Sequence, residues 1–386
     1  MAPSWSDLPS ELLGVVLLHL PCLADRVYFA AVCRSWRFAA AGRVLVPAPQ
    51  LPWLLLLPSA DAPSFVSLLA GFTRRRLSLP DGARDARHCG SHEGGWFAVA
   101  ADGWRRYELV NLFSRARIPL PERLRVPILG IVSCVIVRAV ALSAPPTSPG
   151  CLAAALVCGA SNLAFLRPGL DTHWMASETV DRLQDILYHE GEVLRGFHAV
   201  TDYEAVTVFT QGGAPGAAAL MMASRSYRMQ RRPGASSAGV SRYLVESRGK
   251  LLMVVRRFPS VEHGSSASTM PRQNRRFDIL EMTVQAQPHG RHTASWEDLD
   301  GGLDGRVLFL ARGCSRAFEA SQFSGFQEGV YFLDDTSFDI SLALSSGGNF
   351  PCSDIGWYSD RQITRGIKGF PSEFQSNCSS PAWVYP

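Results

Sequence analysis

The residues best suited to chemistry in this sequence are His88, Cys89 and His92, because imidazole and thiolate groups are common zinc ligands in proteins. They lie within the string His88-Cys89-Gly90-Ser91-His92, and no fourth ligand follows at a spacing typical of zinc sites. We therefore expect no metal site here.

The glycine-rich and acidic segments do not form a catalytic set either. Residues 211–216 resemble a phosphate-binding loop, but no Lys-Ser or Lys-Thr follows, and Pro215 lacks the backbone N–H that such a loop uses. The pairs Asp334-Asp335 and Glu297-Asp298 are adjacent, so their side chains should point apart and face water. Gly-x-Ser-x-Gly and His-Glu-x-x-His motifs do not occur. The sequence thus predicts no catalytic residue and no cofactor, and a protein that is not an enzyme.

Charge and cysteine usage narrow the class of protein. The formal net charge is only +4, and the 38 Lys and Arg residues are scattered, which argues against a nucleic-acid partner. The 9 Cys are an odd number without a C-x-x-C pair, as expected for free thiols in the nucleus or cytoplasm. The run Arg74-Arg75-Arg76 near Ser78 is either a localisation or phosphorylation signal or, as we expect, a solvated loop.

No segment is typical of a membrane anchor. Residues 12–18 imitate the apolar core of a signal peptide, but Asp7 and Glu11 stand where such a peptide is basic. Residues 127–143 are short for a membrane span and contain Arg138. We therefore expect no membrane partner.

The elements that position functional residues begin with three short helices. Asp7 is a suitable cap, Pro9 suits a first helical turn, and Pro21 ends the first apolar run. A second helix is expected near a cap at Asp25, and a third follows from Arg34. Three helices this short cannot enclose all their apolar side chains, which are Leu12, Leu13, Val16, Leu17, Leu20, Val32 and Trp36. A partner is therefore predicted to cover the remaining face, where each buried Leu or Val contributes about 1.5 to 3 kcal/mol.

The order of residues in this segment resembles the F-box. The matching strings are Leu8-Pro9, Glu11-Leu12-Leu13, Leu20-Pro21, Asp25-Arg26 and Ala31-Val32-Cys33-Arg34-Ser35-Trp36-Arg37. The resemblance implies an F-box at residues 1–45 that binds the Skp-type adaptor of cullin-RING ubiquitin ligases and, through it, the cullin. It also implies adaptor-binding positions, which are Leu8, Pro9, Leu12, Val16, Leu20, Val32, Cys33 and Trp36. The alternative is that some of them, Trp36 and Val32 especially, only hold the three helices together.

Beyond residue 45 the sequence predicts an all-β domain, because short apolar or alternating runs are separated by Gly, Pro, Asn, Asp and Ser. Strands are expected at residues 95–100, 106–110, 131–137, 154–158, 205–209, 242–245, 250–255, 306–311 and 329–333. Three similar triplets suggest repeats of about 55 to 60 residues, compatible with the blades of a β-propeller. The triplets are Tyr107-Glu108-Leu109, Phe277-Asp278-Ile279 and Phe338-Asp339-Ile340.

Longer strings resemble the KIB-type, kelch-like propeller that follows the F-box in a large group of plant proteins. They are Glu93-Gly94-Gly95-Trp96 and residues 107–121, 243–247, 329–335 and 381–386. The resemblance implies a mainly β fold, with a β-propeller of about six to seven blades at residues 46–386 that recognises a substrate. Residues 211–219 and 231–239 depart from the family pattern and are expected to be loops.

The two ends of the propeller should meet. Residues 49–58 and 383–386 are both rich in aromatic, aliphatic and Pro residues, and a ring removes its open edges only when its ends pair. We therefore predict that Trp53 and Trp383 lie in the same closing region.

Two functions of different kinds follow from these features. In the first, the chain is the substrate-recognition subunit of an SCF-type ubiquitin ligase, with the F-box docking the Skp-type adaptor and the propeller recruiting a target protein. In the second, a propeller that binds a ligand or acts as an enzyme carries a degenerate F-box. A third hypothesis is an F-box protein that binds its target without degrading it.

Overall fold

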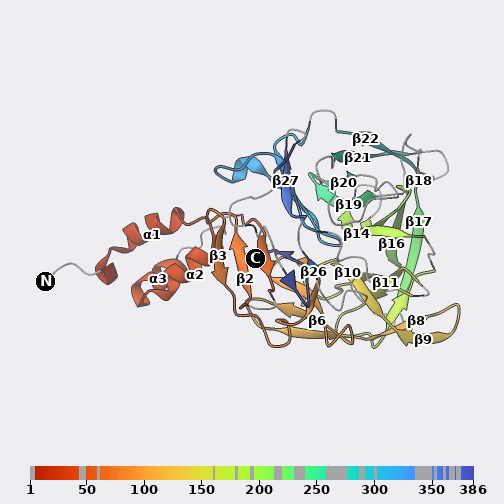
Figure 1. Cartoon of the computed structure of the whole chain (residues 1–386), viewed down its shortest axis with the longest axis horizontal. Helices are drawn as coiled ribbons and strands as arrows, with labels where there is room; N and C mark the ends of the chain where they lie inside the picture. Colours follow the sequence, from red (N-terminus) through yellow and green to blue (C-terminus); the bar gives the residue numbers. More distant parts are fainter. Residues whose placement is uncertain are drawn as a thin grey trace.

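A computed structural model of the chain shows a three-helix lobe beside a ring of β-sheets (Figure 1). It describes residues 5–42, 49–58, 61–159, 161–178, 181–191, 195–212, 220–229, 240–257, 276–286, 292–299, 302–334, 350–351, 354–359, 362–364, 370 and 375–386. Within these residues, no helix has both the length and the apolarity needed to cross a membrane. The predicted order of a small helical region and a β-propeller is confirmed, and the propeller has six blades.

The helical lobe contains η1 (Trp5–Asp7), α1 (Ser10–Leu18), α2 (Leu23–Ala31) and α3 (Arg34–Gly42). α1 begins directly after Pro9, whose φ of -55° is suited to a helix start. The predicted caps are wrong: Asp7 belongs to η1, and α2 begins at Leu23 after Cys22. Asp25 lies in the first turn of α2, where it forms an ion pair with Arg75 instead of capping the helix.

Blades 1 to 3 follow the lobe. Blade 1 comprises β30 (Ala382–Val384), β1 (Trp53–Leu56), β2 (Ser64–Ser67) and β3 (Thr73–Arg76). Blade 2 comprises β4 (Arg87–His92), β5 (Trp96–Ala101), β6 (Arg106–Asn111) and β7 (Arg117–Leu120). Blade 3 comprises β10 (Ile136–Leu142), β11 (Ala153–Cys158), β12 (Leu163–Leu166), β13 (Trp174–Ala176), β8 (Arg123–Val126) and β9 (Ile131–Cys134).

Blades 4 to 6 complete the ring. Blade 4 comprises β14 (Leu183–Glu190), β15 (Arg195–Thr201), β16 (Val206–Gly212) and β17 (Met221–Ser226). Blade 5 comprises β19 (Val240–Ser247), β20 (Lys250–Arg257), β21 (Arg276–Ala286), β22 (His292–Asp298) and β18 (Arg228–Met229). Blade 6 comprises β24 (Arg316–Glu319), β23 (Arg306–Leu310), β25 (Gly329–Phe332), β27 (Gly356–Ser359) and β28 (Gln362–Thr364), and η3 (Ala320–Gln322) follows β24. A separate pair, β26 (Phe350–Pro351) and β29 (Gln375–Ser376), is also described.

The ring closes by pairing of its two ends in blade 1. β1 and β30 are antiparallel neighbours, with Trp53 opposite Val384 and Leu54 opposite Trp383. Trp383 is fully buried, and its Nε1 donates to the carbonyl of Leu310 at 3.1 Å, which connects the closing strand to blade 6. The prediction that Trp53 and Trp383 share the closing region is confirmed.

Two of the three repeated triplets occupy equivalent positions. Tyr107-Glu108-Leu109 lies on β6 and Phe277-Asp278-Ile279 on β21, and each strand is the third of its blade. The triplet at residues 338–340 lies outside the described residues, as do the predicted loop at 231–239 and most of that at 211–219. The single strand expected at residues 131–137 is wrong. The chain forms β9 and β10 on either side of Val135, whose N–H donates to the carbonyl of Glu122 at 3.0 Å.

A buried carboxylate connects three blades at the centre of the ring. Asp185 on β14 is fully buried and accepts N–H bonds from Ile186 at 2.9 Å, Leu244 of blade 5 at 2.8 Å and Gly313 after β23 at 2.7 Å. Burial raises the pKa of Asp185 to about 7, although Arg312 and these N–H groups oppose the shift. Packing nearby is tight enough to require glycine: at Gly90, with φ 149°, a Cβ would lie 2.2 Å from the carbonyl oxygen of Val140.

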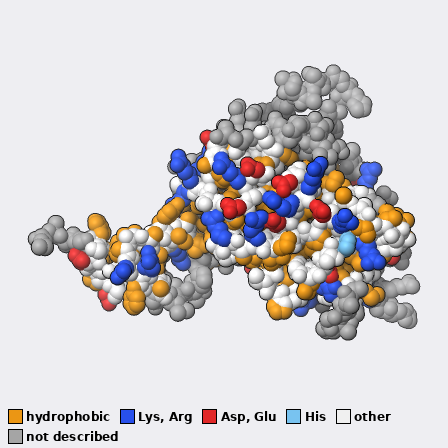
Figure 2. Space-filling view, turned by 90° about the horizontal axis from the view of Figure 1, so that it is seen from below, with side chains coloured by type: hydrophobic (Ala, Val, Ile, Leu, Met, Phe, Trp, Pro, Cys, Tyr) orange, Lys and Arg blue, Asp and Glu red, His pale blue; other side chains and the backbone are white. Residues whose placement is uncertain are grey.

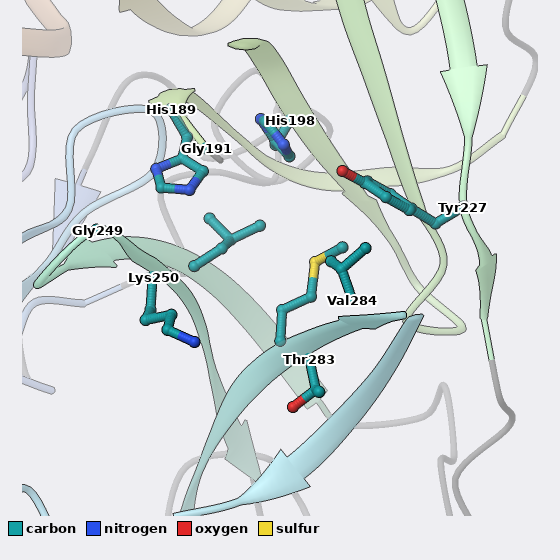
Figure 3. Close-up of a pocket in the computed structure, with 10 residues that line it drawn as sticks. His189, Gly191, His198, Tyr227, Gly249, Lys250, Thr283 and Val284 are labelled. Atoms are coloured by element: carbon teal, nitrogen blue, oxygen red, sulfur yellow. The ribbon is translucent and has the colours of Figure 1, made fainter. Parts of the chain in front are cut away.

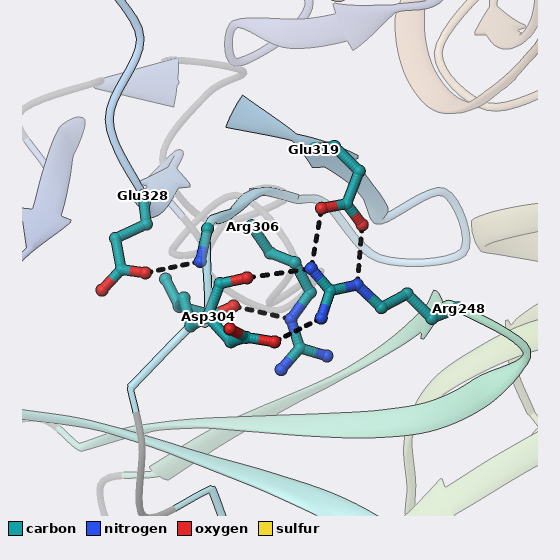
Figure 4. A network of polar contacts seen from close by, with 7 residues as sticks. Arg248, Asp304, Arg306, Glu319 and Glu328 are labelled. Carbon is teal, nitrogen blue, oxygen red and sulfur yellow. Dashed lines mark hydrogen bonds and ion pairs between the residues drawn. The ribbon is translucent and has the colours of Figure 1, made fainter. Parts of the chain in front are cut away.

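An exposed ion-pair network joins blades 5 and 6 (Figure 4). Arg248, in the turn between β19 and β20, binds Asp304 at 2.5 Å and both carboxylate oxygens of Glu319 at 2.7 and 2.8 Å. These bonds to Arg248 lower the pKa of both carboxyl groups. Because the network is largely exposed to solvent, it contributes little energy compared with the buried contacts of the same seam.

Candidate functional site

The helical lobe has a very small core of its own. Leu13 and Leu17 of α1 pack against Phe29 of α2 and Ala39 of α3, and all four side chains are buried. Trp36 covers one side of this core, with its ring 4.5 Å from that of Phe29 and its Nε1 donating to the carbonyl of Trp5 at 3.1 Å. The three helices therefore enclose only a few of the apolar side chains of the lobe.

The remaining apolar side chains of the lobe face solvent, and Figure 2 shows many of them on the protruding lobe. Phe38 is 78% exposed, Val32 57% and Leu12 52%. Among the described residues, nine of the seventeen exposed large apolar side chains belong to the lobe: Trp5, Leu12, Val15, Val16, Leu18, Val27, Tyr28, Val32 and Phe38. Such a concentration over three short helices is typical of a surface that another protein covers.

The eight residues predicted to bind an adaptor divide into two groups. Pro9, Leu12, Val16 and Val32 are exposed, and Leu12 and Val16 share one face of α1. The other four are partly buried: Leu8, Leu20 and Trp36 pack against the lobe core, and Cys33 is half-buried. The packing alternative thus describes the position of Trp36 but not that of Val32. Contact of either group with an adaptor stays a prediction.

Polar contacts fix the lobe to blade 1. Gln50 accepts the N–H of Leu23 at 2.8 Å and donates to the carbonyl of Pro21 at 2.8 Å, so one side chain satisfies both groups where α2 begins. The Sγ of Cys22 lies 2.9 Å from the Oγ of Ser67 on β2. Cys22 and Ala24 also belong to the apolar cluster that contains Trp53, Leu55 and Phe65. The lobe therefore shares part of its core with the propeller.

An arginine that sequence reasoning placed in a loop makes a further contact between the lobe and blade 1. Arg74-Arg75-Arg76 lies on β3, not in a solvated loop, because β3 pairs along its whole length with β2. Arg75 forms an ion pair with Asp25, and its guanidinium lies 5.2 Å from the ring centre of Tyr28. Side chains alternate between the two faces of a strand, so of these three arginines only Arg75 points toward the lobe. Three identical residues in a row give no sign of this alternation in the sequence.

The His, Cys and acidic residues considered above for chemistry do not gather into a site. His88 Nε2 lies 2.9 Å from the Oγ of Ser91, and burial lowers the pKa of His88 to about 3. Among the described residues, no three His, Cys, Asp or Glu side chains gather as metal ligands. Asp334 is buried, contrary to the expectation that it faces water, and it lines a small cavity of about 70 Å³ with Arg87 and Arg312. Asp335 lies outside the described residues, and Glu297 and Asp298 are exposed as expected.

Comparison with protein families matches two parts of the chain. Residues 65–359 match the family described as the KIB1-4 β-propeller, and residues 5–45 match the F-box domain. The first range contains strands of all six blades, and the second contains η1 and all three helices.

Similar proteins of known name come from Arabidopsis thaliana. F-box protein At4g00893 is 29% identical over 184 residues, which cover 46% of this chain and 43% of the relative. Putative F-box protein At4g22170 is 32% identical over 126 residues, covering 30% of this chain and 33% of the relative. F-box protein SKIP23 is 33% identical over 75 residues, covering 19% of this chain and 18% of the relative. The matched regions thus span less than half the length of each relative.

Proposed function

The chain belongs to the KIB1-4 β-propeller family, and on that basis we propose that it is the substrate-recognition subunit of an SCF-type cullin-RING ubiquitin ligase. The helical lobe binds a Skp-type adaptor, and the propeller recruits a target protein. The chain supplies no chemistry in this role. It raises the effective concentration of the target near the ubiquitin-carrying enzyme.

The observation that carries this proposal is the apolar surface of the lobe. Its core contains four buried side chains, while nine large apolar side chains face solvent. A partner that buries a few of them gains about 1.5 to 3 kcal/mol for each, which is enough for a stable complex. The match of residues 5–45 to the F-box domain supports a Skp-type adaptor as that partner.

The contacts between lobe and blade 1 support a receptor role more than that of an isolated propeller. Gln50 and Arg75 hold α2 against the propeller, so a target on the propeller would keep a defined position relative to the adaptor. None of the eight described cysteines belongs to a disulfide, which supports the nucleus or the cytosol as the compartment.

Adaptor capture by the full-length protein tests the proposal. In the double variant Leu12→Glu with Val16→Glu, two exposed side chains of α1 become charged, and we expect capture to fall at least about a hundredfold because charges would be buried unpaired. The matched control is Ile131→Glu with Val132→Glu on β9, two aliphatic side chains that are 46% exposed on the propeller. This control should capture the adaptor as the wild type does.

Two results would contradict the proposal. Wild-type protein that captures no Skp-type adaptor would favour a propeller with a degenerate F-box. Equal loss in the α1 variant and the β9 control would mean that the lobe surface is not the binding site. A third hypothesis, binding without degradation, is separated by measuring ubiquitin transfer to captured targets in the reconstituted complex.

A further inference from the structure

A cavity of about 140 Å³ lies at the seam between blades 4 and 5 (Figure 3). Blade 4 contributes His189 from β14 and His198 from β15, and blade 5 contributes Leu251 from β20 and Met282 from β21. Tyr227 comes from the connection between β17 and β18, where the chain passes from one blade to the next. Residues far apart in the sequence therefore line one partly open cavity.

His198 presents a hydrogen-bond acceptor to this cavity. Its Nδ1 lies 3.1 Å from the carbonyl oxygen of Gly196, and because a carbonyl only accepts, Nδ1 carries the proton. The side chain is 2% exposed, and burial lowers its pKa to about 4. The ring is therefore neutral at pH 7, and Nε2 keeps its lone pair.

His189 has an unused polar atom at the same place. The side chain is 6% exposed, and within the described residues its Nδ1 has no hydrogen-bond partner. Its ring centre lies 5.2 Å from that of His198.

Tyr227 adds a donor, and the opposite wall is apolar. Figure 3 shows the hydroxyl of Tyr227 directed toward His198, and this hydroxyl makes no hydrogen bond within the described part of the chain. Leu251 and Met282 are both buried and line the facing wall. At the rim, the Nζ of Lys250 lies 3.8 Å from a carboxylate oxygen of Glu281, so the positive charge of Lys250 is balanced.

We propose that this cavity binds the primary amide side chain of a glutamine in the recruited protein. The proposal rests on the receptor function proposed above. The amide N–H₂ donates to Nε2 of His198, the amide oxygen accepts from the hydroxyl of Tyr227, and the two methylenes pack against Leu251 and Met282. A carboxylate would meet the lone pair of His198, and an ammonium would leave the hydroxyl of Tyr227 without an acceptor. Of these three groups, the amide is the one that matches both polar atoms.

Titration of the full-length protein with butyramide, which reproduces the glutamine side chain, tests the site. Histidine-labelled protein is followed by NMR, with butyrate and butylammonium as probes of the same length. We expect saturable, millimolar binding of butyramide that shifts the signals of His198 and His189, and at least about tenfold weaker binding of the two charged probes. Tyr227→Phe should weaken butyramide binding about fivefold, because it removes one hydrogen bond and keeps the ring.

Tyr203→Phe is the matched control, since Tyr203 is also on blade 4 but does not line the cavity and donates to Asp181 at 2.8 Å. It should leave butyramide binding unchanged. The proposal is overturned if butyramide does not saturate, if butyrate binds equally well, or if Tyr227→Phe behaves as the control does. Adaptor capture by the lobe is measured separately, so failure of the cavity and failure of the receptor function give different results.

Discussion

The helical lobe leaves most of its large apolar side chains exposed to solvent, whereas the propeller buries most of its own. In the lobe, four side chains form the core and nine large apolar ones remain exposed. In the propeller, apolar clusters extend across the seams, as where Val200 and Val208 of blade 4 pack with Leu244 and Met253 of blade 5. Only eight large apolar side chains are exposed among all the described residues of the propeller.

The two regions therefore differ in how much of their apolar surface a partner would have to cover. The propeller completes its own core, and its ring closes through β1 and β30. Cavities, loops and polar groups are the features of the propeller that suit binding. The lobe is too small to enclose its apolar side chains, so under the proposed function the adaptor would cover the exposed ones and add to the stability of the lobe. The two regions should therefore respond differently to substitutions of similar chemical severity.

Asp185→Ala should give the largest effect, and it should be confined to the propeller. The change leaves the N–H groups of Ile186, Leu244 and Gly313 buried without an acceptor, at about 1 to 3 kcal/mol each, so we expect a loss of about 5 kcal/mol in the free energy of unfolding. Urea unfolding measures it. Asp181→Ala, which removes a carboxylate bonded to exposed Tyr203, is the control and should have little effect. Equal stability of the two variants would contradict a central role for Asp185.

Asp185 also marks the limit of what the sequence predicts. Local patterns predicted the three helices and eight of the nine expected strands, because period and turn residues act over a few positions, while the closure at Trp53 and Trp383 followed from the similar composition of the two ends. The donors to Asp185 come from three blades, and Arg75 meets Asp25 across the boundary of the lobe. Such partners are set by the closure of the ring and the docking of α2. The repeated triplets that contain Glu108 and Asp278 could be recognised in the sequence. The burial of Asp334 could not, because it depends on residues that are distant in the sequence.

Leu17→Ala should produce the next largest effect, and it should be confined to the lobe. Leu17 is 4% exposed in a core of four buried side chains, so its truncation is expected to cost about 3 kcal/mol. Amide hydrogen exchange should accelerate in α1, α2 and α3, while blades 2 to 6 keep their protection. Leu18→Ala changes the next residue, which is 55% exposed, and should leave exchange unaltered. Equal acceleration across the blades would show that the lobe and the propeller unfold together.

The contribution of His198 to the stability of the propeller should fall in acid, by less at each pH unit than the loss expected for Leu17→Ala. Burial lowers the pKa of His198 to about 4, so between about pH 6.5 and about pH 4 the unfolded chain binds a proton that the folded chain does not. Stability therefore falls as the pH falls, by up to about 1.4 kcal/mol per pH unit for this residue.

Asp185 acts with the opposite sign in much of the same window, because its folded pKa of about 7 makes the folded chain bind the extra proton and gain stability as the pH falls. The comparison of wild type with His198→Phe cancels this contribution. Unfolding at several pH values should show that the free energy of unfolding of His198→Phe, relative to the wild type, rises as the pH falls from about 6.5 to about 4. Identical pH dependence in the two proteins would mean that His198 is not held neutral by burial.

Arg75→Ala should have the smallest effect on stability and yet act on both regions at once. It removes the ion pair with Asp25 and the contact with the ring of Tyr28, a partly buried set worth about 1 kcal/mol. We expect faster hydrogen exchange at the start of α2 and a broader distribution of lobe-to-propeller distances between spin labels, with no change in propeller unfolding. Arg76→Ala alters the neighbouring, exposed position of β3 and should match the wild type. An unchanged distance distribution in Arg75→Ala would mean that Gln50 and the shared core around Cys22 fix the lobe without this ion pair.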